Sequence, residues 1–153
     1  MTVEKDGFIA DCADTVAAGN VSEQDQHLIA CARRAFEKAV RVARAGFPVY
    51  EIGRAVEKEA RKDGFSIIRE LGGHGVGRTI HEEPSVPNFA DRTVTSRLRE
   101  GLVITIEPII ASGSGQSFLD DDGWTIRTVD ESHVAHYEHT IMITKDQPIL
   151  LTA

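Results

Sequence analysis

The sequence has few of the features that mark several common classes of protein. It contains two cysteines, Cys12 and Cys31, and no Cys-x-x-Cys pair, so free thiols are expected rather than a disulfide framework. No hydrophobic run approaches the length of a membrane span, and the segment from Met1 to Asp6 has no apolar core of a signal peptide. These absences predict a cytoplasmic protein with no membrane partner.

Basic residues are also in the minority. The chain has 17 Lys and Arg against 24 Asp and Glu, which gives a formal net charge of −7. A nucleic-acid surface needs clustered Lys and Arg along the phosphate backbone, so no nucleic-acid partner is expected. A length of 153 residues with 41% hydrophobic residues predicts a single globular domain over residues 1–153.

A hairpin and two helices are predicted in the first half of the chain. Asp6-Gly7 is a two-residue turn signal, followed by a strand from Phe8 through Asp11 towards Val16. The strand before this turn has almost no length, so another segment or chain is expected to pair with the hairpin.

The first helix is expected to begin at Ser22, because Ser22 with Asp25 three residues later is a typical N-terminal cap. Apolar residues then recur at helical spacing up to Gly46 and Pro48, which end the helix. A second helix is predicted over residues 49–63.

The second half is predicted to be mostly strands. Short strands are expected at residues 65–69, 102–107, 125–128, 136–144 and 149–151, with a glycine-histidine loop after the first of these. Pro84 and Pro87 are expected to keep their segment irregular. This order predicts an α+β fold in which helices pack on one face of an antiparallel sheet.

Four side chains are candidate metal ligands: Asp11, His74, Glu107 and Glu138. Each is predicted on a strand or at a strand end, where the backbone can direct it to a common point. Carboxylate oxygens with one imidazole nitrogen suit Mn, Fe, Co or Zn. Each has an ordinary alternative as a solvated acid or a surface histidine. Glu107 and Glu138 favour the metal more than Asp11 does, because a glutamate in an apolar run needs a partner if it is buried.

Two further residues are candidates for contact with substrate. His81 lies seven residues after His74 and is placed to hydrogen-bond a substrate carbonyl or amide, although a surface histidine beside Glu82 and Glu83 is an equal alternative. Trp124 fits a pocket wall or an ordinary core anchor equally well. The remaining histidines, His133 and His136 among them, are expected on the surface.

These motifs resemble those of the bacterial type I methionine aminopeptidases, within the pita-bread metallopeptidase family. The resemblance runs from about Val3 to Thr152 and rests on five segments: Lys5-Asp6-Gly7-Phe8 with Asp11; Gly73-His74-Gly75-Val76-Gly77-Arg78 with His81-Glu82-Glu83-Pro84; Thr105-Ile106-Glu107-Pro108; Asp122-Gly123-Trp124; and Tyr137-Glu138-His139-Thr140. It implies a partial pita-bread (creatinase/aminopeptidase-like) fold, with a curved antiparallel sheet and helices on one face.

The resemblance implies an activity, a cofactor and residue roles. It implies a metal-dependent hydrolase that removes N-terminal methionine from peptides or nascent proteins. Asp11, His74, Glu107 and Glu138 match four of the family's five ligands to two divalent metals, and Glu107 also matches a proton shuttle. His81 matches a histidine that contacts substrate. Trp124, and Ile80 where the family often has an aromatic residue, match positions of the methionine pocket.

The resemblance also predicts a departure from the family pattern. The family's first Asp ligand would fall just before Met1, so the sequence resembles the C-terminal larger part of the enzyme, N-terminally truncated. One ion per chain (Co, Mn, Fe or Zn) is therefore expected rather than two, together with impaired activity. The alternatives are a non-catalytic metal-binding or protein-binding relative, and an incomplete enzyme completed by another chain or a homodimer.

Overall fold

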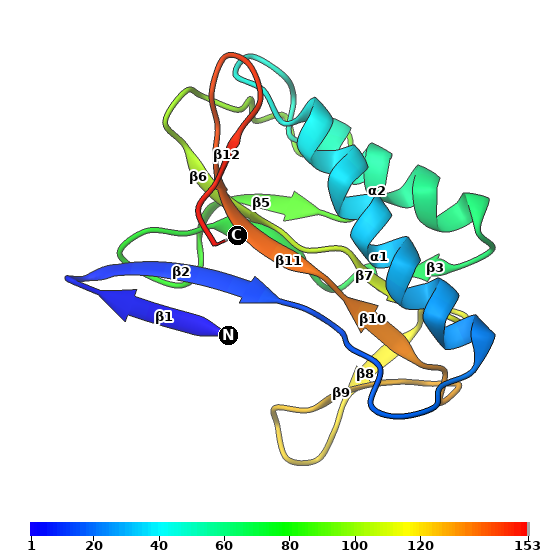
Figure 1. The fold of residues 1–153 in the computed structure, drawn as a ribbon. Coiled ribbons are helices and arrows are strands. Elements are labelled where there is room, and N and C mark those ends of the chain that lie inside the picture. The colour runs from blue at the N-terminus through cyan, green and yellow to red at the C-terminus, as the bar shows by residue number, and fades with distance from the viewer. Residues whose placement is uncertain (153) are drawn as a thin grey trace.

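The computed structural model describes residues 1–152 and places two helices on one side of antiparallel sheets (Figure 1). The main sheet has seven strands in the order β1-β2-β11-β6-β4-β5, with β12 beside β11. Their bounds are Thr2–Lys5, Phe8–Ala13, Glu138–Met142, Val103–Ile106, Gly72–Gly75, Glu82–Pro87 and, for β12, Ile149–Leu150. The α+β class and the helices on one face are confirmed.

Two smaller sheets continue from the main one. Strands β10 (Val134–His136), β7 (Ile109–Ala111) and β3 (Ser66–Ile67) form a three-stranded sheet, and β8 (Ser117–Leu119) pairs with β9 (Ile126–Thr128). The predicted strand at 136–144 corresponds to β10 and β11, which are separated at Tyr137. The strands β7 and β8 were not predicted from the sequence, because three residues are too few to show a period of two.

Helices α1 (Glu23–Val42) and α2 (Tyr50–Lys62) confirm the helical predictions within a few residues. The side chain of Ser22 accepts the backbone N–H of Asp25 at 3.0 Å, which is the predicted N-terminal cap. The buried face of α1 carries Leu28, Cys31, Ala32, Ala35, Phe36 and Ala39. Burying a side chain as large as Leu28 or Phe36 contributes about 1.5–3 kcal/mol to stability, so this face holds α1 against the sheet.

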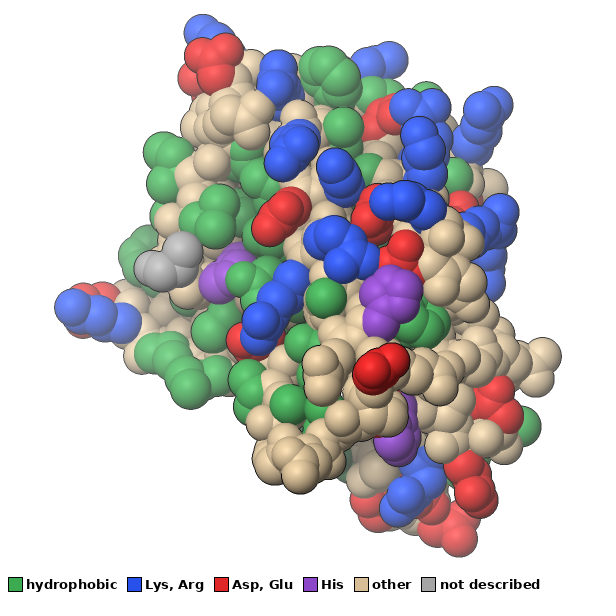
Figure 2. All heavy atoms as spheres, turned by 45° about the vertical axis from the view of Figure 1, so that its right-hand side comes forward, with side chains coloured by type: hydrophobic (Ala, Val, Ile, Leu, Met, Phe, Trp, Pro, Cys, Tyr) green, Lys and Arg blue, Asp and Glu red, His purple; other side chains and the backbone are tan. Residues whose placement is uncertain are grey.

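The outer face of the molecule beside the helices is charged. Figure 2 shows Lys and Arg side chains gathered there with Asp and Glu among them. Within this charged surface, Arg34 pairs with Glu59 at 3.2 Å and Arg61 with Glu57 at 2.8 Å. No helix within residues 1–152 has both the length and the apolar composition needed to cross a bilayer.

The N-terminal hairpin is longer than the sequence predicted. Its turn residues Asp6 and Gly7 have φ angles of 54° and 76°, as a tight two-residue turn requires. The first strand, β1, pairs with β2 over four residues, with Thr2 opposite Asp11. Strand β1 is fully exposed and lies at the edge of the main sheet, while β2 lies between β1 and β11. The hairpin therefore fixes β2, and Asp11 with it, against the centre of the sheet.

Two predictions about the glycine-histidine region were wrong. Residues 72–75 form strand β4 rather than a loop, and the proline-containing segment forms strand β5 rather than an irregular segment. Strand β5 is at the sheet edge, where a proline lacking its N–H breaks no ladder. Glycine is required in β4 by close packing, because a Cβ on Gly73 would lie 2.4 Å from the carbonyl oxygen of Thr105.

Candidate metal centre

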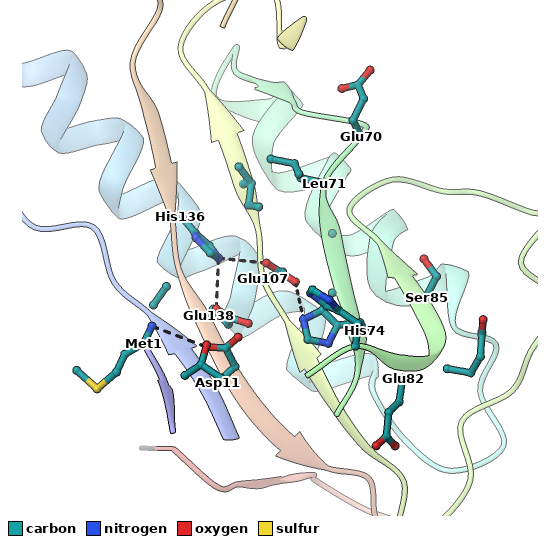
Figure 3. A pocket seen from close by; sticks show the side chains of 17 residues that line it. Met1, Asp11, Glu70, Leu71, His74, Glu82, Ser85, Glu107, His136 and Glu138 are labelled. Atoms are coloured by element: carbon teal, nitrogen blue, oxygen red, sulfur yellow. Dashed lines mark hydrogen bonds and ion pairs between the residues drawn. The ribbon is translucent and has the colours of Figure 1, made fainter. Parts of the chain in front are cut away.

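A cavity of about 780 Å³ opens on the face of the main sheet opposite the helices (Figure 3). Four adjacent strands, β2, β11, β6 and β4, each bring one candidate ligand to it. The candidates are Asp11 on β2, Glu138 on β11, Glu107 directly after β6 and His74 on β4. The structure therefore brings together all four residues that the sequence singled out as ligands.

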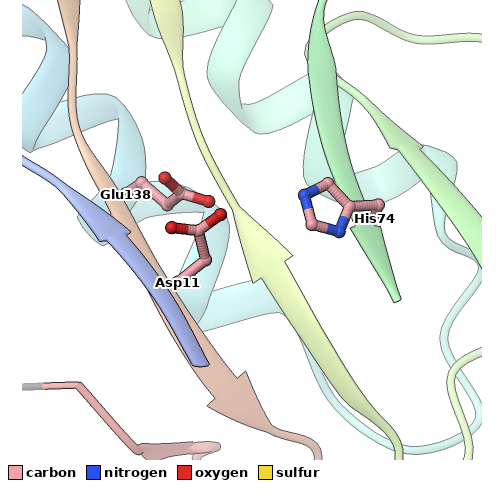
Figure 4. A group of neighbouring side chains, drawn as sticks. All are labelled: Asp11, His74 and Glu138. Carbon is pink, nitrogen blue, oxygen red and sulfur yellow. The ribbon is translucent and has the colours of Figure 1, made fainter. Parts of the chain in front are cut away.

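Three of these side chains form one compact group. Asp11, His74 and Glu138 each place a ligand atom within 4.8 Å of the other two, and Figure 4 shows them directed toward one another. The side chains of His74 and Glu138 retain 12% and 4% of their exposure. Their spacing and burial match a site for a small cation rather than a solvated surface cluster.

Threonine hydroxyl groups hold the backbone around the ligands. The Thr105 hydroxyl accepts the His74 backbone N–H at 3.1 Å and donates to Glu107 Oε1 at 3.3 Å. The Thr140 hydroxyl bonds to both backbone polar groups of Asp11. Thr105 and Thr140 are fully buried and lie opposite each other in the β6–β11 register. These hydrogen bonds hold the backbone of His74 and Asp11 and the carboxylate of Glu107 in place. Such support preorganises a metal site.

A backbone carbonyl group on the same strand determines the tautomer of His74. Nδ1 lies 2.9 Å from the carbonyl oxygen of Gly75, and a carbonyl can only accept, so Nδ1 carries the proton and donates. The other ring nitrogen, Nε2, then has a free lone pair and lies 3.6 Å from Glu107 Oε1. This is the form in which an imidazole coordinates a metal.

The site concentrates three carboxylates, and the fixed positive charge beside them is the N-terminal ammonium group, 3.7 Å from Asp11 Oδ1. Within residues 1–152, no Lys or Arg side chain forms an ion pair with Asp11, Glu107 or Glu138. Burial, and then the nearby charges of Glu107 and Asp11, raise the pKa of Glu138 to about 8. Buried carboxylates are stable when they are paired or bind a metal. Three carboxylates and a neutral imidazole therefore fit a divalent cation.

The predicted substrate residues lie in different places. His81 lines the cavity, and its ring packs edge-on against His74 with 4.4 Å between centroids. Ile80 is half-buried outside the cavity lining. Trp124 lies in the turn between β8 and β9 and is 87% exposed, so it is not a core anchor. The roles of His81, Ile80 and Trp124 in substrate binding stay predictions.

One histidine of the cavity was not predicted to lie there. His136 was expected on the surface, but it lines the cavity, with Nε2 3.3 Å from Glu107 Oε2 and 3.5 Å from Glu138 Oε2. The signal was present in the period of two along a strand, which places residues 136 and 138 on one face. The period alone does not show which face of the strand borders a cavity.

Comparisons with known proteins agree with this geometry. Residues 1–145 match the family model described as metallopeptidase family M24. A methionine aminopeptidase of Aquifex aeolicus is 44% identical over 96% of this chain, and methionine aminopeptidase 2 of Bacillus subtilis is 42% identical over 99%. The crystal structure of the methionine aminopeptidase from Rickettsia prowazekii superposes with a TM-score of 0.95 at 36% identity, over 99% of this chain.

The match covers only part of the length of each relative. The chain spans 58% and 61% of the two curated relatives and 62% of the Rickettsia chain. The matched part contains all four ligand candidates, the cavity and the sheet that carries them. On the strength of the family match and of this shared fold, the chain belongs to metallopeptidase family M24.

Proposed function

We propose that this chain is a metalloaminopeptidase that removes N-terminal methionine from peptides or proteins. The observation that carries the proposal is the convergence of Asp11, His74, Glu107 and Glu138 from four adjacent strands. The names of the similar proteins, methionine aminopeptidases, supply the substrate.

The four residues are proposed to hold one divalent ion, with Co, Mn, Fe or Zn as candidates. The mixed oxygen and nitrogen donors fit these metals, and the burial of the carboxylates without a Lys or Arg partner among residues 1–152 favours binding. When bound, such an ion supplies Lewis-acid chemistry, because it acidifies water and polarises a peptide carbonyl.

Two residues are proposed to handle the substrate and its protons. Glu107 Oε1, fixed by Thr105, takes a proton from the attacking water and passes it to the leaving amine. His81, beside His74 at the cavity wall, donates a hydrogen bond to the scissile carbonyl and stabilises the charge that develops on its oxygen. The peptide N-terminus occupies the cavity in front of these groups.

The test compares Glu107→Gln with Glu100→Gln, a surface control whose partner is Lys145 at 3.5 Å. Release of free methionine from a peptide with an unblocked N-terminal Met is measured with Mn, Fe or Co. We expect Glu107→Gln to lose at least ~100-fold in turnover, as for loss of a general acid–base group, and Glu100→Gln to keep the parent rate.

Unchanged turnover in Glu107→Gln would refute the proposed mechanism. If no methionine is released with any of these metals although an ion is bound, the peptidase activity is refuted. A non-catalytic metal-binding relative is then the better description. The exposed edge strand β1 leaves room for pairing with another chain, and a native mass spectrum distinguishes monomer from homodimer.

A further inference from the structure

His136 has a buried nitrogen with no hydrogen-bond partner. Its Nε2 atom is inaccessible to solvent, although the whole side chain keeps 34% of its exposure. Two carboxylate oxygens lie near it, Glu107 Oε2 at 3.3 Å and Glu138 Oε2 at 3.5 Å, but neither is aligned for a hydrogen bond. A buried polar atom without a hydrogen-bond partner costs free energy and is rare in folded proteins. A bound ligand at His136 Nε2 would supply the missing partner.

The spacing of these three atoms matches ligands on one ion. Oxygen and nitrogen ligands lie about 2.0–2.2 Å from a divalent ion such as Zn, so two ligands on the same ion are separated by roughly 3–3.5 Å. The distances from His136 to the two glutamates fall within this range. Glu107, His136 and Glu138 have ligand atoms that all lie within 4.8 Å of one another.

The two oxygens of Glu107 face two different histidines. Oε1 lies 3.6 Å from His74 Nε2, whereas Oε2 lies 3.3 Å from His136 Nε2 (Figure 3). Glu138 likewise belongs both to the group with Asp11 and His74 and to the group with His136. The two glutamates are therefore placed between two sets of ligands rather than within one.

The position of His136 is fixed by its strand. Its backbone N–H donates to Thr15 Oγ1 at 2.8 Å, and the same hydroxyl donates to its carbonyl oxygen at 2.9 Å. On the other side, His136 pairs with Ile109 in the β10–β7 register. Because the backbone of His136 is held on both sides, its imidazole ring keeps its direction toward the cavity, as a metal ligand must.

We propose that His136 is a metal ligand, and that Glu107, His136 and Glu138 hold a second divalent ion beside the one on Asp11 and His74. This inference rests on the proposed metal centre, with which it shares the two glutamates. It replaces the expectation of a single ion, which counted only four ligands. One imidazole with two carboxylates selects a transition metal such as Co, Zn, Mn or Fe over Mg or Ca.

The first test counts ions by native mass spectrometry of the whole chain titrated with Co²⁺. We expect two ions on the parent chain and one on His136→Gln. His74→Ala is expected to keep the ion on the His136 side. The matched control is His133→Gln, three residues away, whose ring pairs with Asp25 at 2.6 Å outside the cavity and which should keep two ions.

The outcomes separate this inference from the proposed function. One ion on the parent chain that is lost in His74→Ala and kept in His136→Gln overturns the inference and leaves the first site intact. No ion on the parent chain overturns both. Two ions retained by His136→Gln also overturn the role of His136. Circular dichroism of each variant confirms that a lost ion does not reflect a lost fold.

A second test observes coordination directly. Chains with ¹⁵N-labelled histidine are titrated with diamagnetic Zn²⁺, and the His136 ring resonances are assigned by their loss in His136→Gln. We expect the Nε2 resonance of His136 to shift to the position of a metal-bound nitrogen during addition of the second equivalent. A His136 resonance unmoved at two equivalents overturns the inference, whatever the ion count.

Discussion

The hydroxyl of Thr140 hydrogen-bonds both backbone polar groups of Asp11: it accepts from the Asp11 N–H at 2.8 Å and donates to the Asp11 carbonyl oxygen at 2.8 Å. Thr140 is fully buried on β11, two residues after Glu138. A single side chain thereby ties β2 to the strand that carries another ligand. It sets the position of Asp11 relative to Glu138.

Thr140→Val is expected to destabilise the fold and weaken metal binding together. The substitution keeps the shape but leaves two buried backbone groups unpaired, which costs about 1–3 kcal/mol each or less if β2 relaxes. Because Asp11 then moves, we expect Co²⁺ affinity to fall roughly 10–100-fold. Urea unfolding and calorimetric titration measure the two effects. Thr140→Ser retains the hydroxyl and should preserve both; an equal loss in Thr140→Ser would contradict the assignment.

Gly73→Ala is expected to separate β4 from β6. The added Cβ would lie 2.4 Å from the Thr105 carbonyl oxygen. Because the contact is with backbone, relieving it requires the strands to move apart. We expect a loss of about 1–3 kcal/mol, as for overpacking, and a clear fall in Co²⁺ affinity because His74 moves away from Glu107. Gly19→Ala is the comparison for affinity: this exposed position has open space, and although its φ of 77° costs an alanine some stability, the Co²⁺ affinity should be unchanged.

Metal addition is expected to stabilise the chain against heat. Free Co²⁺ at 100 times its dissociation constant adds about 2.7 kcal/mol by mass action, which corresponds to a rise in Tm of roughly 5–10 °C for a chain of this size. A chelator reverses the rise. His74→Ala should lose the part of the rise that comes from the ion on the His74 side, and His133→Ala should lose none. Of these two histidines, only His74 directs a free nitrogen lone pair into the centre, whereas His133 pairs with Asp25. An equal rise in both variants would place the stabilising ion elsewhere.

The two cysteines are expected to differ in reactivity. Burial, with a smaller contribution from the Asp63 carboxylate, raises the pKa of Cys31 to about 12 from an ordinary 9.0. Alkylation by iodoacetamide requires the thiolate, so at pH 8.5 the half-buried Cys12 should react and Cys31 should not until the chain is unfolded. The Cys12→Ser variant isolates Cys31; rapid labelling of that variant while folded would contradict its burial.

The same pKa difference predicts that the folded state becomes less stable at high pH. Above pH 9 the unfolded thiol of Cys31 loses its proton, whereas the folded thiol keeps its own up to about pH 12. The folded state then binds more protons, so the free energy of unfolding falls as pH rises through this window. Urea unfolding of the parent chain and Cys31→Ala across pH 8–11 measures the difference, and a parallel pH dependence in both would rule out this contribution.

The elements that the sequence predicted well are those with local signals. The Ser22 cap, the apolar spacing of α1 and the Asp6-Gly7 turn are each decided within a few residues. The strands β7 and β8 were missed because their pairing, not their composition, makes them strands. Strand β5 was misjudged because only its place at the sheet edge makes its prolines acceptable.

The sequence by itself determined the four candidate ligands, their order and the helical and turn elements, because residue chemistry and short-range periodicity are properties of the chain. Only the tertiary structure decided that β2, β11, β6 and β4 are neighbours, so that Asp11, Glu138, Glu107 and His74 meet in one cavity. It also decided that His136 faces that cavity, with its Nε2 between two glutamates. The physical reason is that strand order and register depend on contacts between residues far apart in the chain, which no local pattern encodes.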